Sequence, residues 1–314
     1  MTIKEIYDLA IELGRKADFR SDQQISRLLK RSKDKYEKLS SKEKNFFDKE
    51  NLKNPYSDSR ILYGDIDKKV KKLIVGIDMK EPELLLADKL GDIDLVVSHH
   101  PVGIGLAGLD EVMALQTDVL NLYGVPINVA EGLLKKRISE VARGVSSSNH
   151  NRSVDVARLL KMPYMCLHTV CDNLAADFLK KKIEKVKPVY VSDIMDLLLE
   201  IPEYQEASKI KAGPKLFAGS RENHCGKVAL TEITGGTEGS VEIYERLAQA
   251  GIGTVIGMHM SEKHTEAAKA AHVNAVIAGH ISSDSIGVNL LLDEIEKKGV
   301  EVVPASGLIR VKRI

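Results

Sequence analysis

The sequence has no tryptophan, and its aromatic residues amount to only 4%. Proteins that bind single-stranded nucleic acids usually stack the bases on aromatic side chains, so this composition argues against such a role. The formal net charge is only +1, from 46 basic and 45 acidic side chains among 314 residues. We therefore expect no nucleic-acid partner, because proteins generally bind the phosphates of a nucleic acid through a clearly basic surface.

Cysteines and long apolar runs are also scarce. Cys166, Cys171 and Cys225 are too few and too unevenly placed for a disulfide framework, which fits a reducing compartment. No apolar run approaches the roughly 18 residues of a membrane-spanning helix, and the first residues do not resemble a signal peptide. We therefore expect a soluble, cytoplasmic protein with no membrane partner.

Residues 1–56 differ from the rest of the chain, because they contain a single glycine and have helical spacing. One helix face would carry Ile3, Ile6, Leu9 and Leu13. Ser21 can cap a second helix. Its lysine-rich continuation over 30–49 is interleaved with acidic residues, so we interpret it as a solvated face or an oligomer contact rather than a nucleic-acid arm. The sequence predicts an N-terminal helical extension over 1–56.

From residue 57 onward, short apolar runs alternate with amphipathic segments, a pattern typical of an α/β fold. Strands are expected at 72–78, 95–98, 125–129, 165–168, 228–234, 254–257 and 275–279. Helices are expected at 81–90, 110–123, 153–160, 174–183, 192–199, 240–249, 261–271 and 284–298. We predict two α/β halves, 57–183 and 225–314. The proline-containing stretch 184–224 is predicted to be an irregular connector between them.

Four of the predicted strands end at a histidine or within two residues of one. The histidines at these strand ends are His99 with His100, His168, His259 and His280. Because ligands in open α/β sheets gather outside the carboxyl ends of the strands, we expect these side chains to converge in one crevice. Neighbouring side chains leave a strand in opposite directions, so His99 and His100 would each serve one metal ion.

Two of these histidines are followed four residues later by an aspartate, His168 by Asp172 and His280 by Asp284. A carboxylate can bridge two cations, and mixed imidazole and carboxylate ligands favour Zn, Fe, Mn or Co over Mg or Ca. A single strand-terminal histidine is more often structural than a ligand. Four of them together, with this repeated spacing, favour a two-metal site.

The glycine-rich segment 234–240 lies between a predicted strand and a predicted helix. Free backbone N–H groups at such a place can hold phosphate. The spacing of its glycines matches neither a P-loop nor a dinucleotide fingerprint, and Glu238 adds a negative charge. We therefore interpret the segment as a tight turn.

The segment 94–101, Asp-Leu-Val-Val-Ser-His-His-Pro, resembles the double-histidine signature of the NIF-three-like dinuclear metal proteins, or GTP cyclohydrolase I type 2 homologues. The segment 168–172 is similar to that family's His-Thr-x-x-Asp element, and 278–284 to its Gly-His-x-x-x-Glu element. The resemblance covers about residues 57–314. It implies two similar three-layer α/β halves facing each other across a dimetal cleft, in a homohexamer built as a trimer of dimers.

By motif position, the resemblance implies that two divalent transition-metal ions are bound by His99, His100, Asp172, His280 and Asp284. The sequence also departs from the family. Asp284 stands where a glutamate is usual, so its carboxylate reaches one methylene less far. Around 256–259 the family commonly has a Thr-Gly-Glu run, and the acid is missing here.

The leading functional hypothesis is a metal-dependent hydrolase or cyclohydrolase that uses a metal-activated water on a small molecule, such as a nucleotide or a phosphoester. His168, His259 and His264 are the candidate proton shuttles, although His264 is as readily an exposed residue. GTP ring opening follows only from the family resemblance, because the sequence has no guanine-specific element. The alternative is a non-catalytic metal-binding adaptor or regulatory protein that forms a ring-shaped oligomer.

Overall fold

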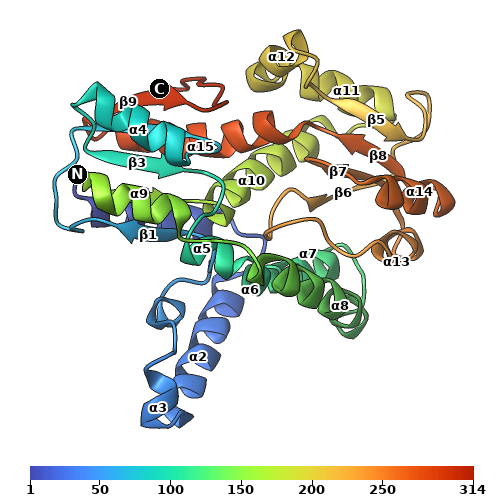
Figure 1. The fold of residues 1–314 in the computed structure, drawn as a ribbon. Helices are drawn as coiled ribbons and strands as arrows, with labels where there is room; N and C mark the ends of the chain where they lie inside the picture. The colour runs from blue at the N-terminus through green and yellow to red at the C-terminus, as the bar shows by residue number, and fades with distance from the viewer.

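The structure, a computed structural model, describes residues 1–314 and contains two β-sheets with helices on both faces (Figure 1). The first sheet has the order β1 (Arg60–Tyr63), β4 (Tyr164–Cys166), β3 (Leu95–Ser98), β2 (Lys72–Gly76) and β9 (Glu301–Ala305). The second has the order β5 (Lys215–Ala218), β8 (Asn274–Ile277), β7 (Ile252–Gly257) and β6 (Lys227–Glu232). In each sheet an antiparallel edge strand, β1 or β5, lies beside parallel strands, four in the first sheet and three in the second. The prediction of two similar α/β halves is confirmed.

Two long helices lie between the sheets, α10 (Thr169–Val186) and α15 (His280–Glu296) (Figure 1). The outer face of the first sheet is covered by α4 (Glu81–Leu90) and α9 (Arg152–Leu160). The outer face of the second is covered by α7 (Ala114–Leu122), α13 (Ile243–Gln249) and α14 (Glu262–Ala270). The strands are therefore buried on both faces, which explains their continuous apolar runs.

The strand at 125–129 was predicted wrongly. Pro126 instead caps α8 (Ile127–Ser146), and Ala130 and Leu134 are buried from that helix. The run Val-Pro-Ile-Asn-Val is too short to separate a strand from a helix start by periodicity. The helix expected at 110–123 is broken at Met113 into α6 (Leu109–Val112) and α7, after the short α5 (Ile104–Ala107).

The stretch 184–224 is more regular than we predicted. It contains α11 (Val191–Leu199), α12 (Pro202–Lys209) and the edge strand β5. Ile194, Leu198 and Tyr204 are buried against the inner face of the second sheet. Pro202 occupies the first turn of α12, where proline is well tolerated, so it marks a helix start rather than a break.

Each spatial half also contains an element from the other part of the sequence. β9, near the C-terminus, pairs in parallel with β2 and so returns to the first sheet. Helix α7, from the first half of the sequence, packs on the second sheet through Leu115 and Val119. A division of the sequence at one point therefore does not describe the spatial halves.

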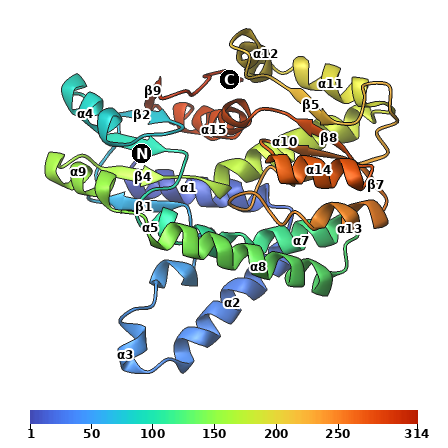
Figure 2. The ribbon, with the colours of Figure 1, turned by 45° about the vertical axis from the view of Figure 1, so that its right-hand side comes forward.

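At the N-terminus, α1 (Ile3–Lys16) belongs to the core, since Ile3, Ile6 and Ala10 are fully buried. Only α2 (Asp22–Lys38) and α3 (Ser41–Lys44) project from the body, as both views show, and the short η1 (Lys49–Leu52) leads back to it (Figures 1 and 2). Ser21 caps α2 as predicted. No helix of the chain is long and apolar enough to cross a membrane.

The crossing of α10 and α15 is close, because Gly287 lies against the backbone of α10. A Cβ at Gly287 would come within 2.0 Å of the Cys171 carbonyl oxygen. We expect Gly287→Ala to lower the free energy of unfolding by about 3 kcal/mol, since the helices would have to move apart. Urea unfolding would measure this change. Gly132→Ala on α8 is the matched control, because a Cβ there meets nothing within 4 Å. Equal losses in both variants would contradict the prediction.

Candidate metal centre

The carboxyl ends of the parallel strands carry the candidate ligands to one place between the sheets. His99 and His100 directly follow β3, and His168 follows β4 as the residue before α10. The first turn of α10 contributes Asp172, and α15 contributes its first residue, His280, and, one turn later, Asp284. Both sheets therefore contribute to a single centre.

Two sets of side chains are close enough to hold a metal ion each. One is His99, His100 and Asp284, and the other is His99, His168 and Asp172, with ligand atoms within 4.8 Å of one another in each set. The His99 Nε2 atom lies 3.3 Å from Asp172 Oδ1 and 3.5 Å from Asp284 Oδ1. The His100 Nε2 atom lies 3.3 Å from Asp284 Oδ2. His168, which we expected to be a proton shuttle, thus lies among the possible ligands.

The atoms that face one another at this centre have no hydrogen-bond partners. These buried atoms are His99 Nε2, Asp172 Oδ1, Asp284 Oδ1 and Asp284 Oδ2. Leaving such groups unpaired away from water costs several kcal/mol, whereas a cation would satisfy all of them. The donor set is also the mixture of imidazole and carboxylate that transition metals prefer. These buried His/Asp groups can hold metal ions.

Three histidines are oriented by a partner on the far side of the ring, which fixes the Nε2 atom towards the centre. The bonded pairs are His99 Nδ1 with Leu167 O at 3.1 Å, His100 Nδ1 with Asp78 Oδ1 at 3.0 Å and His168 Nδ1 with Asp58 Oδ2 at 2.8 Å. Since the acceptors are a carbonyl and two carboxylates, each Nδ1 donates, and in the neutral ring the lone pair is then on Nε2. This is the tautomer that a metal ligand needs.

Sequence reasoning missed Asp58 and Asp78. Asp78 lies at the end of the predicted strand 72–78, beside the same sheet edge as His99. Its position could therefore have identified it as a candidate site residue. Asp58 lies in a loop before β1 and gives no such signal. It is fully buried and also accepts a hydrogen bond from Thr169 Oγ1 at 2.6 Å.

We expect Asp58→Ala to weaken metal binding by about 10- to 100-fold, because the His168 ring would lose the acceptor that fixes its tautomer and direction. A competition titration with a chromogenic chelator would measure the affinity. Asp65→Ala, in an exposed turn, is the control. Unchanged affinity in Asp58→Ala would show that His168 is not a ligand or needs no orienting partner.

Burial and the neighbouring charges shift the pKa values of several side chains at the centre. Burial alone would lower the pKa of His99, but Asp284 and Asp172 raise that pKa well above its usual value. Burial disfavours ionised Asp284, yet the neighbouring His99 and His100 hold its pKa below its usual range. Burial lowers the pKa of His280, so this ring is neutral at neutral pH. The metal-free centre therefore keeps Asp284 ionised and a proton on His99, and a metal ion would displace that proton.

The remaining predicted residues lie at different distances from the centre. His280 Nε2 is 3.6 Å from Asp284 Oδ2, and the His259 ring centroid is 4.9 Å from that of His280. His264 is buried behind the 234–240 segment, where its nitrogens lie 2.6 Å from Ser261 Oγ and 3.1 Å from Gly239 O. The structure therefore brings His259 to the centre but not His264.

The centre opens into a small pocket of about 30 Å³. One wall is formed by residues 232–238, and these include the glycine-rich segment that we interpreted as a tight turn. Gly235 and Gly236 have φ angles of 93° and 92°, which favour glycine. Gln116 from α7 fixes the segment by donating to the carbonyls of Gly235 at 2.8 Å and Thr237 at 2.6 Å. The turn therefore serves as a wall of the pocket.

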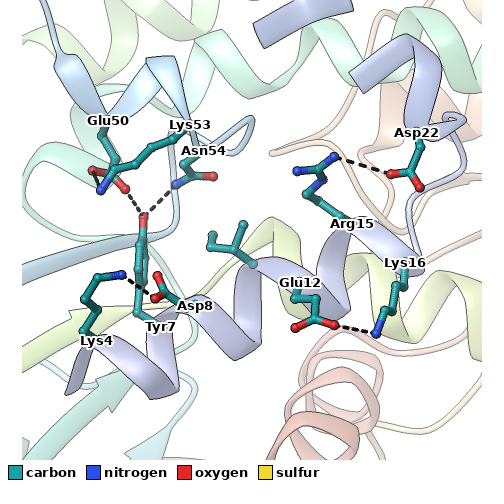
Figure 3. Close-up of a pocket in the computed structure, with 11 residues that line it drawn as sticks. Lys4, Tyr7, Asp8, Glu12, Arg15, Lys16, Asp22, Glu50, Lys53 and Asn54 are labelled. Carbon is teal, nitrogen blue, oxygen red and sulfur yellow. Dashed lines mark hydrogen bonds and ion pairs between the residues drawn. The ribbon is translucent and has the colours of Figure 1, made fainter. Parts of the chain in front are cut away.

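A larger hollow of about 380 Å³ lies elsewhere, between α1 and residues 50–54 (Figure 3). Its charged groups are paired with one another, for example Lys16 Nζ with Glu12 Oε1 at 2.6 Å. Tyr7 bonds Glu50 Oε1 at 2.9 Å. None of the unpartnered buried atoms of the metal centre lies there. We therefore place the functional site at the histidine cluster.

Comparisons with known proteins concern the fold of the chain. No protein-family model and no curated protein sequence matches the chain. A crystal structure of a NIF3 superfamily protein from Sphaerobacter thermophilus superimposes with a TM-score of 0.78 at 25% identity, over 98% of this chain and 99% of that one. Reduced HcgD from Methanocaldococcus jannaschii aligns with a TM-score of 0.49 at 14% identity, over 85% of this chain and 97% of that one.

The Sphaerobacter protein matches over nearly its whole length, including the N-terminal helices that we regarded as an extra piece. The likeness therefore extends beyond the segments from which the family was predicted. The predicted resemblance to the NIF3-like proteins is confirmed by this structural match.

Proposed function

We propose that the protein binds two divalent transition-metal ions and acts as a metal-dependent hydrolase on a small phosphorylated molecule, within the ring-shaped homohexamer that the family resemblance implies. The observation that supports two ions is the pair of ligand sets, in which the one free nitrogen of His99 would bind one ion and His100 or His168 would bind the other. Asp284 presents one oxygen towards His99 and the other towards His100, as a bridging carboxylate would.

The expected ligands are His99, His100, His168, Asp172, His280 and Asp284. Asp284 is shorter than glutamate, yet its carboxylate oxygens lie 3.5, 3.3 and 3.6 Å from Nε2 of His99, His100 and His280. Bound metal ions would lower the pKa of a water and polarise a phosphoryl or carbon centre. His259, beside His280 and 40% exposed, is placed to move a proton between the pocket and solvent.

The size of the pocket favours the alternative, a metal-binding adaptor without catalysis. About 30 Å³ holds only one or two waters, so a nucleotide could not enter without movement of the 232–238 wall. A hydrolase needs an open coordination position, whereas an adaptor can have its metals fully enclosed.

The deciding experiment is metal content per subunit by mass spectrometry, on protein purified without chelators or metal-loading tags, together with the mass in solution. We expect about two transition-metal ions per chain in a hexamer. Hydrolysis of bis(p-nitrophenyl) phosphate by that protein, abolished in His100→Ala, would support the hydrolase. A protein that stays metal-free after Zn, Mn, Fe or Co is added would refute the metal site.

A further inference from the structure

Glu232 is a buried carboxyl group that the proposed ligand set does not use. It ends β6 and lines the same pocket as Asp172 and Asp284. One of its oxygens, Oε2, accepts the backbone N–H of Gly239 at 3.2 Å. The other, Oε1, is buried and has no partner. No arginine or lysine forms an ion pair with it.

Several charged or titratable groups surround this carboxyl. They are Glu238 on the pocket wall, His259 after β7, Arg137 on α8 and Tyr244 on α13. Burial is the largest influence and raises the pKa of Glu232 to about 7, while the Gly239 N–H and His259 oppose the rise. The Tyr244 hydroxyl is likewise buried and unpartnered. Near neutral pH the group therefore gains and loses its proton easily.

We propose that Glu232 is the residue that takes and returns the proton in the pocket beside the metal ions. The role rests on the hydrolase proposed above. As the oxygen of the attacking water bonds to the phosphorus or carbon atom of the substrate, one of its O–H bonds breaks and the proton goes to Glu232 Oε1. The bond between that atom and the leaving group then breaks, and the same proton is given to the oxygen or nitrogen of the leaving group. Glu232 thus finishes the cycle as it began, and no other reactant is needed.

This assignment can be tested without measuring turnover, by carboxyl ¹³C NMR on protein labelled in its glutamate side chains. The Glu232 signal is the one missing from Glu232→Gln, whose amide oxygen can keep the bond from Gly239. Without metal, we expect a midpoint near 7. Added Zn²⁺ should lower the midpoint by about one pH unit or more, because nearby cations favour the carboxylate. Glu242, exposed at the start of α13, serves as the internal control and should not shift.

The outcomes separate the two proposals. If mass spectrometry finds no bound zinc, the metal-dependent function fails, and the role of Glu232 fails with it. If zinc is bound but the Glu232 midpoint stays where it was, only the role of Glu232 is overturned. Should Glu232→Gln fail to fold, Co²⁺ can replace Zn²⁺ in the wild-type protein. The Glu232 signal should then be broadened, and a pocket carboxyl signal that stays sharp would overturn the assignment.

Discussion

Asp284→Asn is expected to remove both metal ions, whereas other single ligand changes remove fewer. Its two carboxylate oxygens face His99 and His100 at 3.5 and 3.3 Å, so the neutral amide would weaken the binding of the ion at each of these two histidines. We expect the metal content to fall from about two ions per chain to none, in a protein with an unchanged circular dichroism spectrum. His280→Ala, whose ring lies farther out, should remove at most one ion.

The matched control for this variant is Asp177→Asn on α10. Asp177 is an aspartate that pairs with Lys181 at the surface, so its change should leave the metal content alone. Loss of metal in both variants would point to a general defect in folding. Full metal content in Asp284→Asn would mean that the two ions do not share this carboxylate.

Compared with the wild type, the metal-free Glu232→Gln variant should gain stability as the pH rises. The folded protein raises the pKa of Glu232 from 4.5 to about 7, so it binds this proton more tightly than the unfolded chain does. Stability from this group is therefore greatest below pH 4.5, falls as the pH rises to about 7 and stays low above it. The shift corresponds to roughly 3 kcal/mol. The amide of Glu232→Gln does not titrate, so its free energy of unfolding does not fall in this way. Relative to the wild type, the free energy of unfolding of the variant should therefore rise by about that amount between about pH 4 and pH 8.

Urea unfolding in the presence of a chelator, at several pH values, would measure this difference. A chelator is needed because bound cations would favour the carboxylate and reduce the effect. Glu242→Gln is the control, since Glu242 is exposed and should show no change in the difference with pH. A Glu232→Gln difference that is flat with pH would show that Glu232 is ionised at little cost in the folded protein.

The sequence by itself indicated the class of fold and most of the metal centre. Apolar runs that end in histidine predicted strands whose carboxyl ends meet, because a strand buried on both faces has a recognisable run of apolar residues. The repeated spacing of His168 with Asp172 and His280 with Asp284 indicated ligands near the starts of the helices that follow these strands, α10 and α15. These patterns lie within short stretches of the chain, so they can be recognised in a single sequence.

Other features depended on contacts between distant segments. β9 joins the first sheet only through its pairing with β2, more than 200 residues earlier in the chain. The partner of His168, Asp58, lies 110 residues away. Neither segment has a periodic pattern that indicates its partner, so neither contact could be predicted from the local sequence alone.

The roles of individual acids were likewise decided by the tertiary structure. Glu232 and Glu238 are two acids only six residues apart in the sequence, yet their environments differ. Glu238 is bonded by the Ser261 N–H and faces His264, whereas Glu232 is buried beside the metal centre with one oxygen unpartnered. The sequence determined that histidines and aspartates gather at the strand ends. Only the packing of two sheets around α10 and α15 decided which carboxyl groups lose their water, because desolvation depends on every element that surrounds a group.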